Sequence, residues 1–227
     1  MTDAHPDART EILQRVRSSL GLPDGRDSIG AVPVPRQYRS TGSLHASELV
    51  ELLTDRLEDY DATVRRTGGT SDDIAAAVQH FLDDAGENSA DSRIVVPSAL
   101  DHAWLGAVEA EVLDDSTESP VDLDVLDGVD AVVTASAVSV ADTGTIMLVG
   151  AGSGRRATTL VPDHHIVVVK VEDIVEIVPE AITKLTGEGL HELPVTMVSG
   201  PSATVDIELI RVQGVHGPRT LDVIIAG

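Results

Sequence analysis

The sequence predicts an α/β fold, with a largely parallel sheet between flanking helices in three layers. Short apolar strands alternate with helical or irregular crossovers from residue 62 onward, and this alternation is typical of parallel sheets. Residues 166–169 are continuously apolar, which favours a strand covered on both faces. Only 2% of the 227 residues are aromatic, so Val, Leu, Ile and Ala must fill the core, and these residues suit strands with helices packed on them.

The N-terminal region predicts one helix followed by a linker. In residues 7–20, Ile12, Leu13, Val16 and Leu20 fall on one helical stripe, and Gly21 stops the pattern. Residues 22–41 are rich in Pro, Gly and Arg and have no period, which is typical of a linker or of an arm that lies over a partner. We therefore divide the chain into an N-terminal helix and linker arm, residues 1–41, and a domain of residues 42–227.

The elements of the domain follow in order. Leucines at helical spacing predict a helix over residues 47–60, and a strand is expected at 62–65. Thr70 and Asp73 form a capping-box pattern that starts a helix ending near residue 84. Pro179 suits the first turn of a short helix. Further strands are expected at 93–96, 131–134, 145–149, 158–161, 166–171, 194–198 and 221–226, and short helices at 173–178 and 179–185.

Charge and composition exclude several classes of function. The chain has 16 basic and 38 acidic residues, a net charge of -22, so it repels nucleic acid and anionic membrane surfaces. Residues 101–130 contain ten carboxylates and no Lys or Arg. We expect a solvated acidic face here, with a docking surface for a basic subunit as the alternative.

The chain contains no cysteine. This excludes disulfides, and it excludes the chain as the thiolate scaffold of an iron-sulfur cluster. No apolar run approaches the ~18 residues of a membrane span, and the first residues do not resemble a secretory signal. We therefore expect a cytoplasmic location.

The C-terminal residues predict a site at the edge of a sheet. Gly200 and Pro201 end the strand at 194–198, because proline donates no ladder hydrogen bond and glycine permits a sharp turn. Hydroxyl and carboxylate residues then alternate, and a second Gly-Pro break precedes the last strand. The residues concerned are Ser202, Thr204, Asp206, Glu208, Gly214, His216, Gly217 and Pro218. The alternative is that the hydroxyls only cap a turn and the acids are solvated.

Two earlier segments are further candidates. Asp142, Thr143, Gly144 and Thr145 precede an apolar strand; they could line the mouth of the sheet or simply form a turn that introduces the strand. The glycine-rich run 150–156 lacks the spacing of a dinucleotide fingerprint, so a hairpin tip is the expected structure. Arg155 in this run could bind a carboxylate or phosphate.

The histidines provide only weak evidence for a metal site. His164 and His165 are adjacent, so in a strand they face opposite sides and cannot chelate one metal. One of them could act with His216 in acid/base chemistry, but no third ligand stands at a fixed spacing. We expect no metal.

The candidate segments resemble a known family. Residues 199–208, Ser-Gly-Pro-Ser-x-Thr-x-Asp-Ile-Glu, and 214–218, Gly-Val-His-Gly-Pro, are similar to the C-terminal signature of the lactate utilisation protein C family (LutC/YkgG), which is built on the LUD domain. Residues 141–145 and 152–155, leading to His165, agree with that family, and the resemblance extends over about residues 60–227. Many family members carry a basic residue at the position of Ala203, so an anion contact made there has no counterpart in this chain.

The resemblance implies both a fold and a function. The fold would be like that of NagB, ribose-phosphate isomerases (RpiA) and CoA transferases. The chain would belong to a system that oxidises L-lactate to pyruvate with iron-sulfur partner subunits, and would itself carry no cluster or other cofactor. Its ligand-binding residues, for a possible small anionic ligand, would be Thr143, Gly144, Thr145, Arg155, His165, Gly200, Pro201, Ser202, Thr204, Gly214 and Gly217. The catalytic candidates are Asp142, Asp206, Glu208 and His216.

Two other functions stay open at the level of sequence. One is a stand-alone isomerase, transferase or ligase acting on a small anion, with a carboxylate as general acid or base and Arg155 holding the anion. The other is a non-catalytic interaction subunit that docks through residues 1–41.

Overall fold

The computed structural model describes residues 7–21, 34–205, 211–213 and 217–227, and the chain forms two compact units, Met1–Tyr38 and Arg39–Gly227. In the first unit, α1 (Ala8–Ser19) is the helix that the apolar stripe predicts. None of its side chains is buried, and Ile12 and Leu20 are 61% and 64% exposed.

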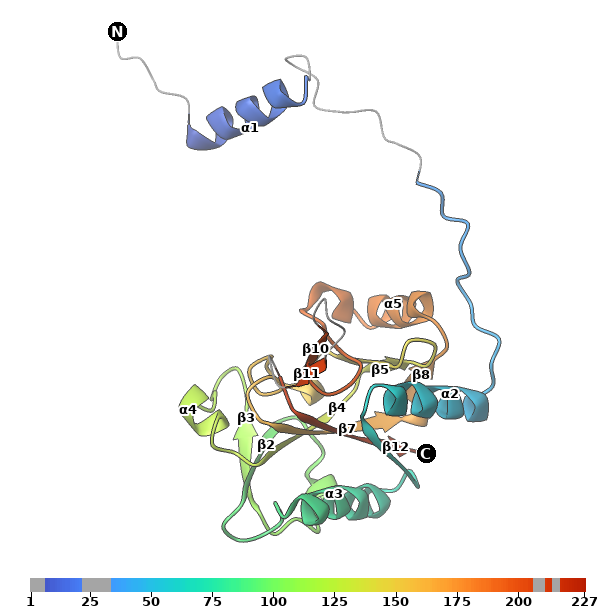
Figure 1. The fold of residues 1–227 in the computed structure, drawn as a ribbon, viewed down its shortest axis with the longest axis vertical. Coiled ribbons are helices and arrows are strands. Elements are labelled where there is room, and N and C mark those ends of the chain that lie inside the picture. The colour runs from blue at the N-terminus through green and yellow to red at the C-terminus, as the bar shows by residue number, and fades with distance from the viewer. Residues whose placement is uncertain (1–6, 22–33, 206–210, 214–216) are drawn as a thin grey trace. The chain divides into compact units, whose positions relative to one another are not determined.

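The second unit is built on a six-stranded, fully parallel sheet (Figure 1). Its strands lie in the order β1 (Thr63–Thr67), β12 (Thr220–Ala226), β7 (His164–Lys170), β4 (Ala131–Ala135), β2 (Arg93–Pro97) and β3 (Glu111–Asp115). Every neighbouring pair is parallel. In β7 the side chains of residues 164–169 are buried, because the sheet is covered on both faces. The predicted α/β fold with a largely parallel sheet and flanking helices is confirmed.

Helix α3 (Ser71–Ala85) covers one face of this sheet (Figure 1). Its start is fixed by the expected capping box, in which the Asp73 amide donates to Thr70 Oγ1 at 3.2 Å and the Thr70 amide donates to Asp73 Oδ2 at 3.3 Å. Ile74, Val78 and Leu82 pack against β-strand residues such as Ile166 and Ile224. The 3-10 helix η1 (His102–Leu105) adds Trp104 and Leu105 to this core.

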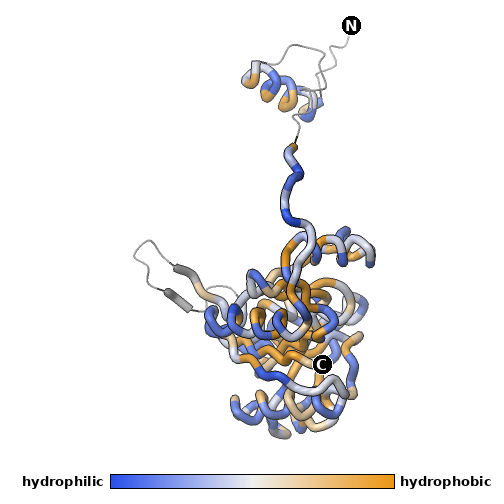
Figure 2. Tube along the Cα trace, turned by 90° about the vertical axis from the view of Figure 1, so that its right-hand side faces the viewer, coloured by the Kyte–Doolittle hydropathy of each residue, from blue (hydrophilic) through white to orange (hydrophobic). Residues whose placement is uncertain are grey.

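The opposite face is covered by α2 (Ala46–Asp59) and by a second sheet. The second sheet has the order β8 (Ile174–Val175), β5 (Val138–Val140), β6 (Thr145–Leu148) and β9 (Thr196–Val198). Helix α5 (Val178–Gly187) packs on its far side through Ala181 and Leu185. Figure 2 shows the resulting apolar interior, enclosed by hydrophilic segments.

Several expected elements differ from the structure. Residues 145–149 and 194–198 are strands, but they belong to the second, mixed sheet and not to the main one. Residues 158–161 form turns and not a strand, and residues 173–178 contain the end of a 3-10 helix (Val171–Asp173) followed by β8 and not a helix. The smaller elements are α4 (Leu123–Leu126), η2 (Ala151–Ser153), η4 (Leu190–Glu192), and an antiparallel ribbon of β10 (Ala203–Val205) and β11 (Arg211–Gln213).

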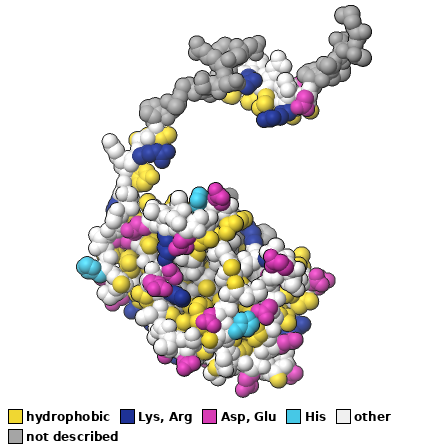
Figure 3. Space-filling model, turned by 180° about the vertical axis from the view of Figure 1, so that it is seen from behind, with side chains coloured by type: hydrophobic (Ala, Val, Ile, Leu, Met, Phe, Trp, Pro, Cys, Tyr) yellow, Lys and Arg dark blue, Asp and Glu magenta, His cyan; other side chains and the backbone are white. Residues whose placement is uncertain are grey.

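The acidic segment 101–130 is only partly the solvated face that was expected. Nine of its ten carboxylate residues are exposed, but Asp115, the last residue of β3, is buried. Acidic side chains are spread over the face of the molecule drawn in Figure 3 and do not gather in one patch. Within the described residues, no helix has the length and apolar character needed to cross a membrane.

Candidate functional site

Two adjoining pockets contain most of the described candidate residues. The corner pocket, of about 430 Å³, is lined by Gly200–Ala203, Gly217, Pro218 and His165, among others. The strap pocket, of about 600 Å³, is lined by the loop that includes Gly150 and Arg155. Thr159 and Thr196 line both pockets, so the two form neighbouring parts of one hollow surface.

The corner pocket forms where the two C-terminal Gly-Pro breaks meet. The Ser202 amide donates to the carbonyl of Pro218 at 2.7 Å, which joins the two breaks directly. A side chain at Gly200 would lie 2.7 Å from the backbone oxygen of Tyr60, so glycine is required for the close approach to the end of α2. The break after β9 and the break before β12 therefore come together although they lie at the ends of different sheets.

The Asp-Thr-Gly corner lies beside this pocket but does not line it. Thr143 Oγ1 and Thr145 Oγ1 share a hydrogen bond of 2.8 Å, and Thr145 Oγ1 lies 3.2 Å from Ser199 Oγ at the pocket wall. A side chain at Gly144, whose φ is +59°, would come within 2.8 Å of Arg56 Cβ. Gly144 thus allows close packing of the turn on α2, and its expected role in ligand binding stays a prediction.

Asp142 is held in the same turn. Its carboxylate lies 3.8 Å from the Arg39 guanidinium, and its backbone oxygen accepts a 3.4 Å hydrogen bond from Arg56 Nε. Asp142 lines neither the corner pocket nor the strap pocket. The Asp-Thr-Gly corner therefore packs against α2 and does not share a pocket with the two Gly-Pro breaks.

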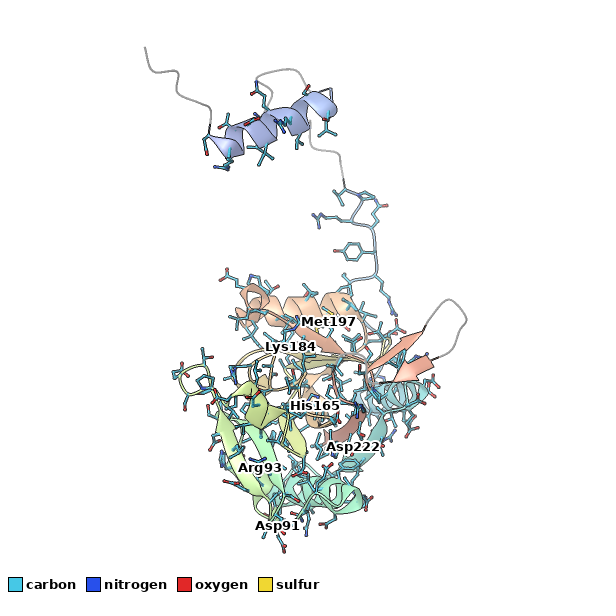
Figure 4. All side chains as sticks on the ribbon, turned by 60° about the vertical axis from the view of Figure 1, so that its left-hand side comes forward. Asp91, Arg93, His165, Lys184, Met197 and Asp222 are labelled. Carbon is cyan, nitrogen blue, oxygen red and sulfur yellow. The ribbon has the colours of Figure 1, made fainter. Side chains whose placement is uncertain are left out.

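His165 is buried in the wall of the corner pocket (Figure 4). Its Nε2 shares a 2.8 Å hydrogen bond with Thr134 Oγ1 on β4. Burial of the ring, together with the neighbouring His164, lowers the pKa of His165 to about 3. The ring is therefore neutral at physiological pH and has one donor and one acceptor nitrogen.

His164 faces the opposite side of the sheet, as strand alternation predicts. Its Nδ1 lies 2.6 Å from Glu87 Oε2, and its Nε2 lies 2.9 Å from Asp222 Oδ2. Figure 4 labels Asp222 and His165, and Asp222 lies on the side of α3. Burial opposes protonation of the ring, but the hydrogen bonds and charges of Asp222 and Glu87 outweigh it and raise the pKa of His164 to about 9. This buried cluster joins β7, β12 and the end of α3 and lines neither pocket.

The strap pocket is built on the loop 150–155, here called the strap, which crosses the carboxyl ends of three strands. Ser153 Oγ donates to the carbonyl of Ala135 at the end of β4 at 2.8 Å. A side chain at Gly154 would lie 2.9 Å from Pro97 Cγ at the end of β2. Arg155 binds Asp115 at the end of β3. Three successive residues thus contact β4, β2 and β3 in the order of these strands in the sheet, which replaces the expected hairpin tip.

Asp115 and Arg155 form a buried ion pair. Arg155 Nε donates to both carboxylate oxygens at 3.0 and 2.9 Å, and Thr158 Oγ1 and the Val121 amide also donate to this carboxylate. Burial opposes ionisation of Asp115, but the hydrogen bonds from Arg155, Thr158 and Val121 outweigh it and hold its pKa below the usual value. The Arg155 guanidinium also donates to the Val121 carbonyl at 3.0 Å. The guanidinium thus ties the strap to β3, and the anion binding by Arg155 that the sequence suggested stays a prediction.

Several expected site residues cannot be placed. Asp206, Glu208, Gly214 and His216 lie outside the described residues, and Thr204 is described only through its backbone in β10. Among the residues that the structure does describe, no group of three or more His, Cys, Asp or Glu side chains could hold a metal ion. Sequence reasoning missed Asp115, whose partners Arg155 and Thr158 lie far from it in the sequence. It also missed Arg156, which lines the strap pocket.

Comparison with known proteins places these features in a family context. The family model described as LUD domain matches residues 70–226. Lactate utilization protein C from Deinococcus radiodurans is 36% identical over 222 residues, covering 97% of this chain and 96% of that protein. Lactate utilization protein C 1 from Bacillus mycoides is 30% identical over 236 residues and 96% of each chain. A crystal structure of a DUF162 family protein from Deinococcus radiodurans matches with a TM-score of 0.64 and 31% identity, covering 82% of this chain and 100% of that chain.

Proposed function

Since the chain belongs to the LUD domain family, we propose that it acts in lactate utilisation, as a component of a system that oxidises L-lactate to pyruvate beside iron-sulfur partner subunits. The observation that carries the proposal is the nearly full-length similarity to lactate utilization protein C of Deinococcus radiodurans. The shared region includes the domain and both pockets, because 97% of this chain is aligned.

The proposal assigns the electron carriers to the partner subunits, and the lack of cysteine in this chain supports that assignment. Oxidation of lactate to pyruvate releases a pair of electrons, and clusters that accept them are normally held by Cys thiolates. This chain has no cysteine, so in our proposal it carries no cluster and the partner subunits do.

The corner pocket is the small-ligand site in this proposal. Its wall combines the neutral His165 ring, the Thr159 and Ser199 hydroxyls and the backbone of Gly200 and Gly217. These groups can donate and accept hydrogen bonds, as recognition of a hydroxyl and a carbonyl or carboxylate requires.

Reconstitution of the complex tests the proposal. The partner subunits are purified with and without this chain, and L-lactate-dependent reduction of a dye is measured. We expect the rate to fall strongly when the chain is left out, and D-lactate serves as the substrate control. An unchanged rate without the chain would remove its role in the oxidation.

A non-catalytic interaction subunit is the second candidate, and α1 favours it. The apolar stripe of α1 is exposed at Ile12, Leu13, Val16 and Leu20, and an amphipathic helix without a covered face is suited to docking in a groove of another protein. In this function, α1 binds the cluster-bearing subunits.

Deletion of residues 1–38 tests the second candidate. The boundary follows the division between the two compact units, so we expect the remaining domain to keep its thermal unfolding transition and to lose co-purification with the partner subunits. The control replaces Gln14 and Ser18 by Ala, on the helix face opposite the apolar stripe. Retained co-purification after the deletion would exclude docking through α1.

The stand-alone enzyme has less support from the described residues. Of its three candidate carboxylates, Asp142, Asp206 and Glu208, only Asp142 lies in the described part of the chain, and Asp142 lines neither pocket.

A further inference from the structure

We propose that the strap pocket is a binding site for an organic anion with an apolar body, whose carboxylate or phosphate is held by the guanidinium of Arg156. This proposal is independent of the role in lactate oxidation. It rests on the position of the pocket in the sheet, its charges, its size and the rigidity of the strap.

The strap pocket lies where the direction of the chain connections changes. From β2 the chain continues to β3 at one edge of the sheet, whereas from β4 it continues to β7 on the other side. Neighbouring strands whose connections diverge leave a crevice at their carboxyl ends, and this is the usual ligand position in open parallel sheets. The strap lies over the ends of β4 and β2 at this point, and the pocket opens beside it, with Ser98 following β2 and Asp115 ending β3 in its wall.

Among the described residues that line the pocket, Arg156 is the cation that remains for a ligand. The pocket wall contains four charged residues, Asp115, Glu118, Arg155 and Arg156, and Asp115 and Arg155 neutralise each other. Arg156 is exposed, and within the described part of the chain its guanidinium makes no hydrogen bond or ion pair. In a chain with a net charge of -22, an arginine that lines a pocket and forms no ion pair with any described carboxylate is available to an anionic ligand. Its planar fork suits a carboxylate or phosphate.

The size and wall of the pocket define the rest of the ligand. A volume of about 600 Å³ is in the range of about 300–1,000 Å³ found for pockets that enclose drug-sized molecules, and exceeds what lactate fills. The apolar residues Leu148, Val149, Leu193 and Pro194 line the pocket together with hydroxyl residues that include Ser116 and Thr117. The ligand therefore combines an anionic group with an apolar body.

The strap fixes the backbone that leads to Arg156. Ser153, Gly154 and Arg155 are each fixed on a strand end, and the carbonyl of Arg156 accepts a 3.2 Å hydrogen bond from Thr159 Oγ1. The backbone that carries Arg156 is thus ordered before a ligand binds, which lowers the entropic cost of binding.

Glu118 restricts the charge of the ligand. It is exposed in the same pocket wall, so it can accept a hydrogen bond from a hydroxyl or amine of the ligand and disfavours a second negative charge near it. The site is therefore better suited to a monoanion than to a dianion.

Binding of small aromatic probes to the full-length chain tests the proposal. Phenylacetate and phenyl phosphate are the anionic probes, 2-phenylethanol is the neutral probe, and affinities are measured by ligand-observed NMR. Arg156→Ala is compared with Arg65→Ala, which removes another exposed arginine, on β1 at the opposite edge of the sheet. Arg156→Lys keeps the charge without the fork, and Glu118→Gln removes the nearby negative charge. Circular dichroism checks the fold of each variant.

The expected result is binding of at least one anion to the wild type and to Arg65→Ala, weakened about ten-fold or more by Arg156→Ala. Arg156→Lys should restore part of the affinity, and Glu118→Gln should strengthen phenyl phosphate more than phenylacetate. The proposal is overturned if neither anion binds at millimolar concentration, if Arg156→Ala and Arg65→Ala bind alike, or if 2-phenylethanol binds as tightly as the anions. Should Arg156→Ala fail to fold, Arg156→Lys is compared with Arg65→Ala in its place. Glu118→Gln is then judged by whether it strengthens phenyl phosphate more than phenylacetate. None of these results depends on lactate oxidation.

Discussion

At the scale of single residues, Asp115 and Asp114 show how neighbours of identical chemistry differ in role. Asp115 is fully buried and bound by Arg155, Thr158 and the Val121 amide, whereas Asp114 is 51% exposed in its side chain and pairs with exposed His102. Removing one partner of a buried pair leaves the other uncompensated, which costs far more than losing a surface pair.

Asp115→Ala should therefore lower the free energy of unfolding by about 3 kcal/mol, because it removes the carboxylate that pairs with Arg155 and accepts from Thr158 and the Val121 amide. Asp114→Ala is the matched control, and it should change stability by less than about 0.5 kcal/mol. Urea unfolding measures both. Equal losses of unfolding free energy in the two variants would show that the Asp115–Arg155 pair stabilises the fold no more than a surface pair does.

His164 gives the stability a defined pH dependence. Its folded pKa is about 9, above the value of about 6.5 in an unfolded chain, so the folded state binds the proton more tightly. The stabilisation is fully present below pH ~6.5 and is lost as the pH rises toward ~9, with a size on the order of 3 kcal/mol.

His164→Gln should remove most of this dependence, so that its unfolding free energy changes less than that of the wild type over the same pH range. His102→Gln, which removes an exposed histidine, should behave like the wild type. Parallel pH profiles for the wild type and His164→Gln would contradict the role of the buried cluster.

At the scale of elements, the strap depends on glycine where it crosses β2. Gly154 has φ +73°, and an added Cβ would lie 2.9 Å from Pro97 Cγ. Gly187, at the end of α5, has nothing within 4 Å of an added Cβ and no positive φ. An alanine is therefore strained and crowded at position 154, whereas it fits without contact at position 187.

Gly154→Ala should destabilise the protein by about 1–3 kcal/mol, and Gly187→Ala should stabilise it by about 0.5–1 kcal/mol, because alanine favours the helix and reduces the entropy of the unfolded chain. Thermal unfolding distinguishes the two. A neutral Gly154→Ala would mean that the strap can leave the end of β2 without cost.

Sequence patterns predicted most elements of the main sheet, since apolar strands and capping residues are local signals. The strand expected at 158–161 was wrong because Thr158 and Thr159 serve turns, where the Thr158 hydroxyl binds Asp115. The strand β3 was missed because it carries three carboxylates, at Glu111, Asp114 and Asp115, and such an edge strand lacks the apolar run that marks a central one.

At the scale of the whole molecule, charge is the dominant property. The arm, residues 1–38, has five basic and five acidic residues, so the entire net charge of -22 belongs to residues 39–227. Most of these charges lie on the surface, where like charges repel one another and oppose the compact state.

Salt should therefore stabilise the protein. Raising NaCl from about 0.05 to about 0.5 M shortens the range of the repulsion, and we expect the thermal midpoint to rise. Tetramethylammonium chloride at equal ionic strength is the control, because screening does not depend on the cation. A rise with sodium alone would point to specific ion binding, and no rise would show that surface repulsion is unimportant.

The sequence by itself determined the α/β class, the exposed stripe of α1, the opposite directions of His164 and His165, and the resemblance to the LUD domain. These features depend on local periodicity and short motifs, which are readable along the chain. Only the tertiary structure decided that the Asp-Thr-Gly corner packs on α2, and that Arg155 binds Asp115, 40 residues away. Those partners are fixed by which strand ends become neighbours, and strand order arises from the packing of the whole sheet, which no local pattern encodes.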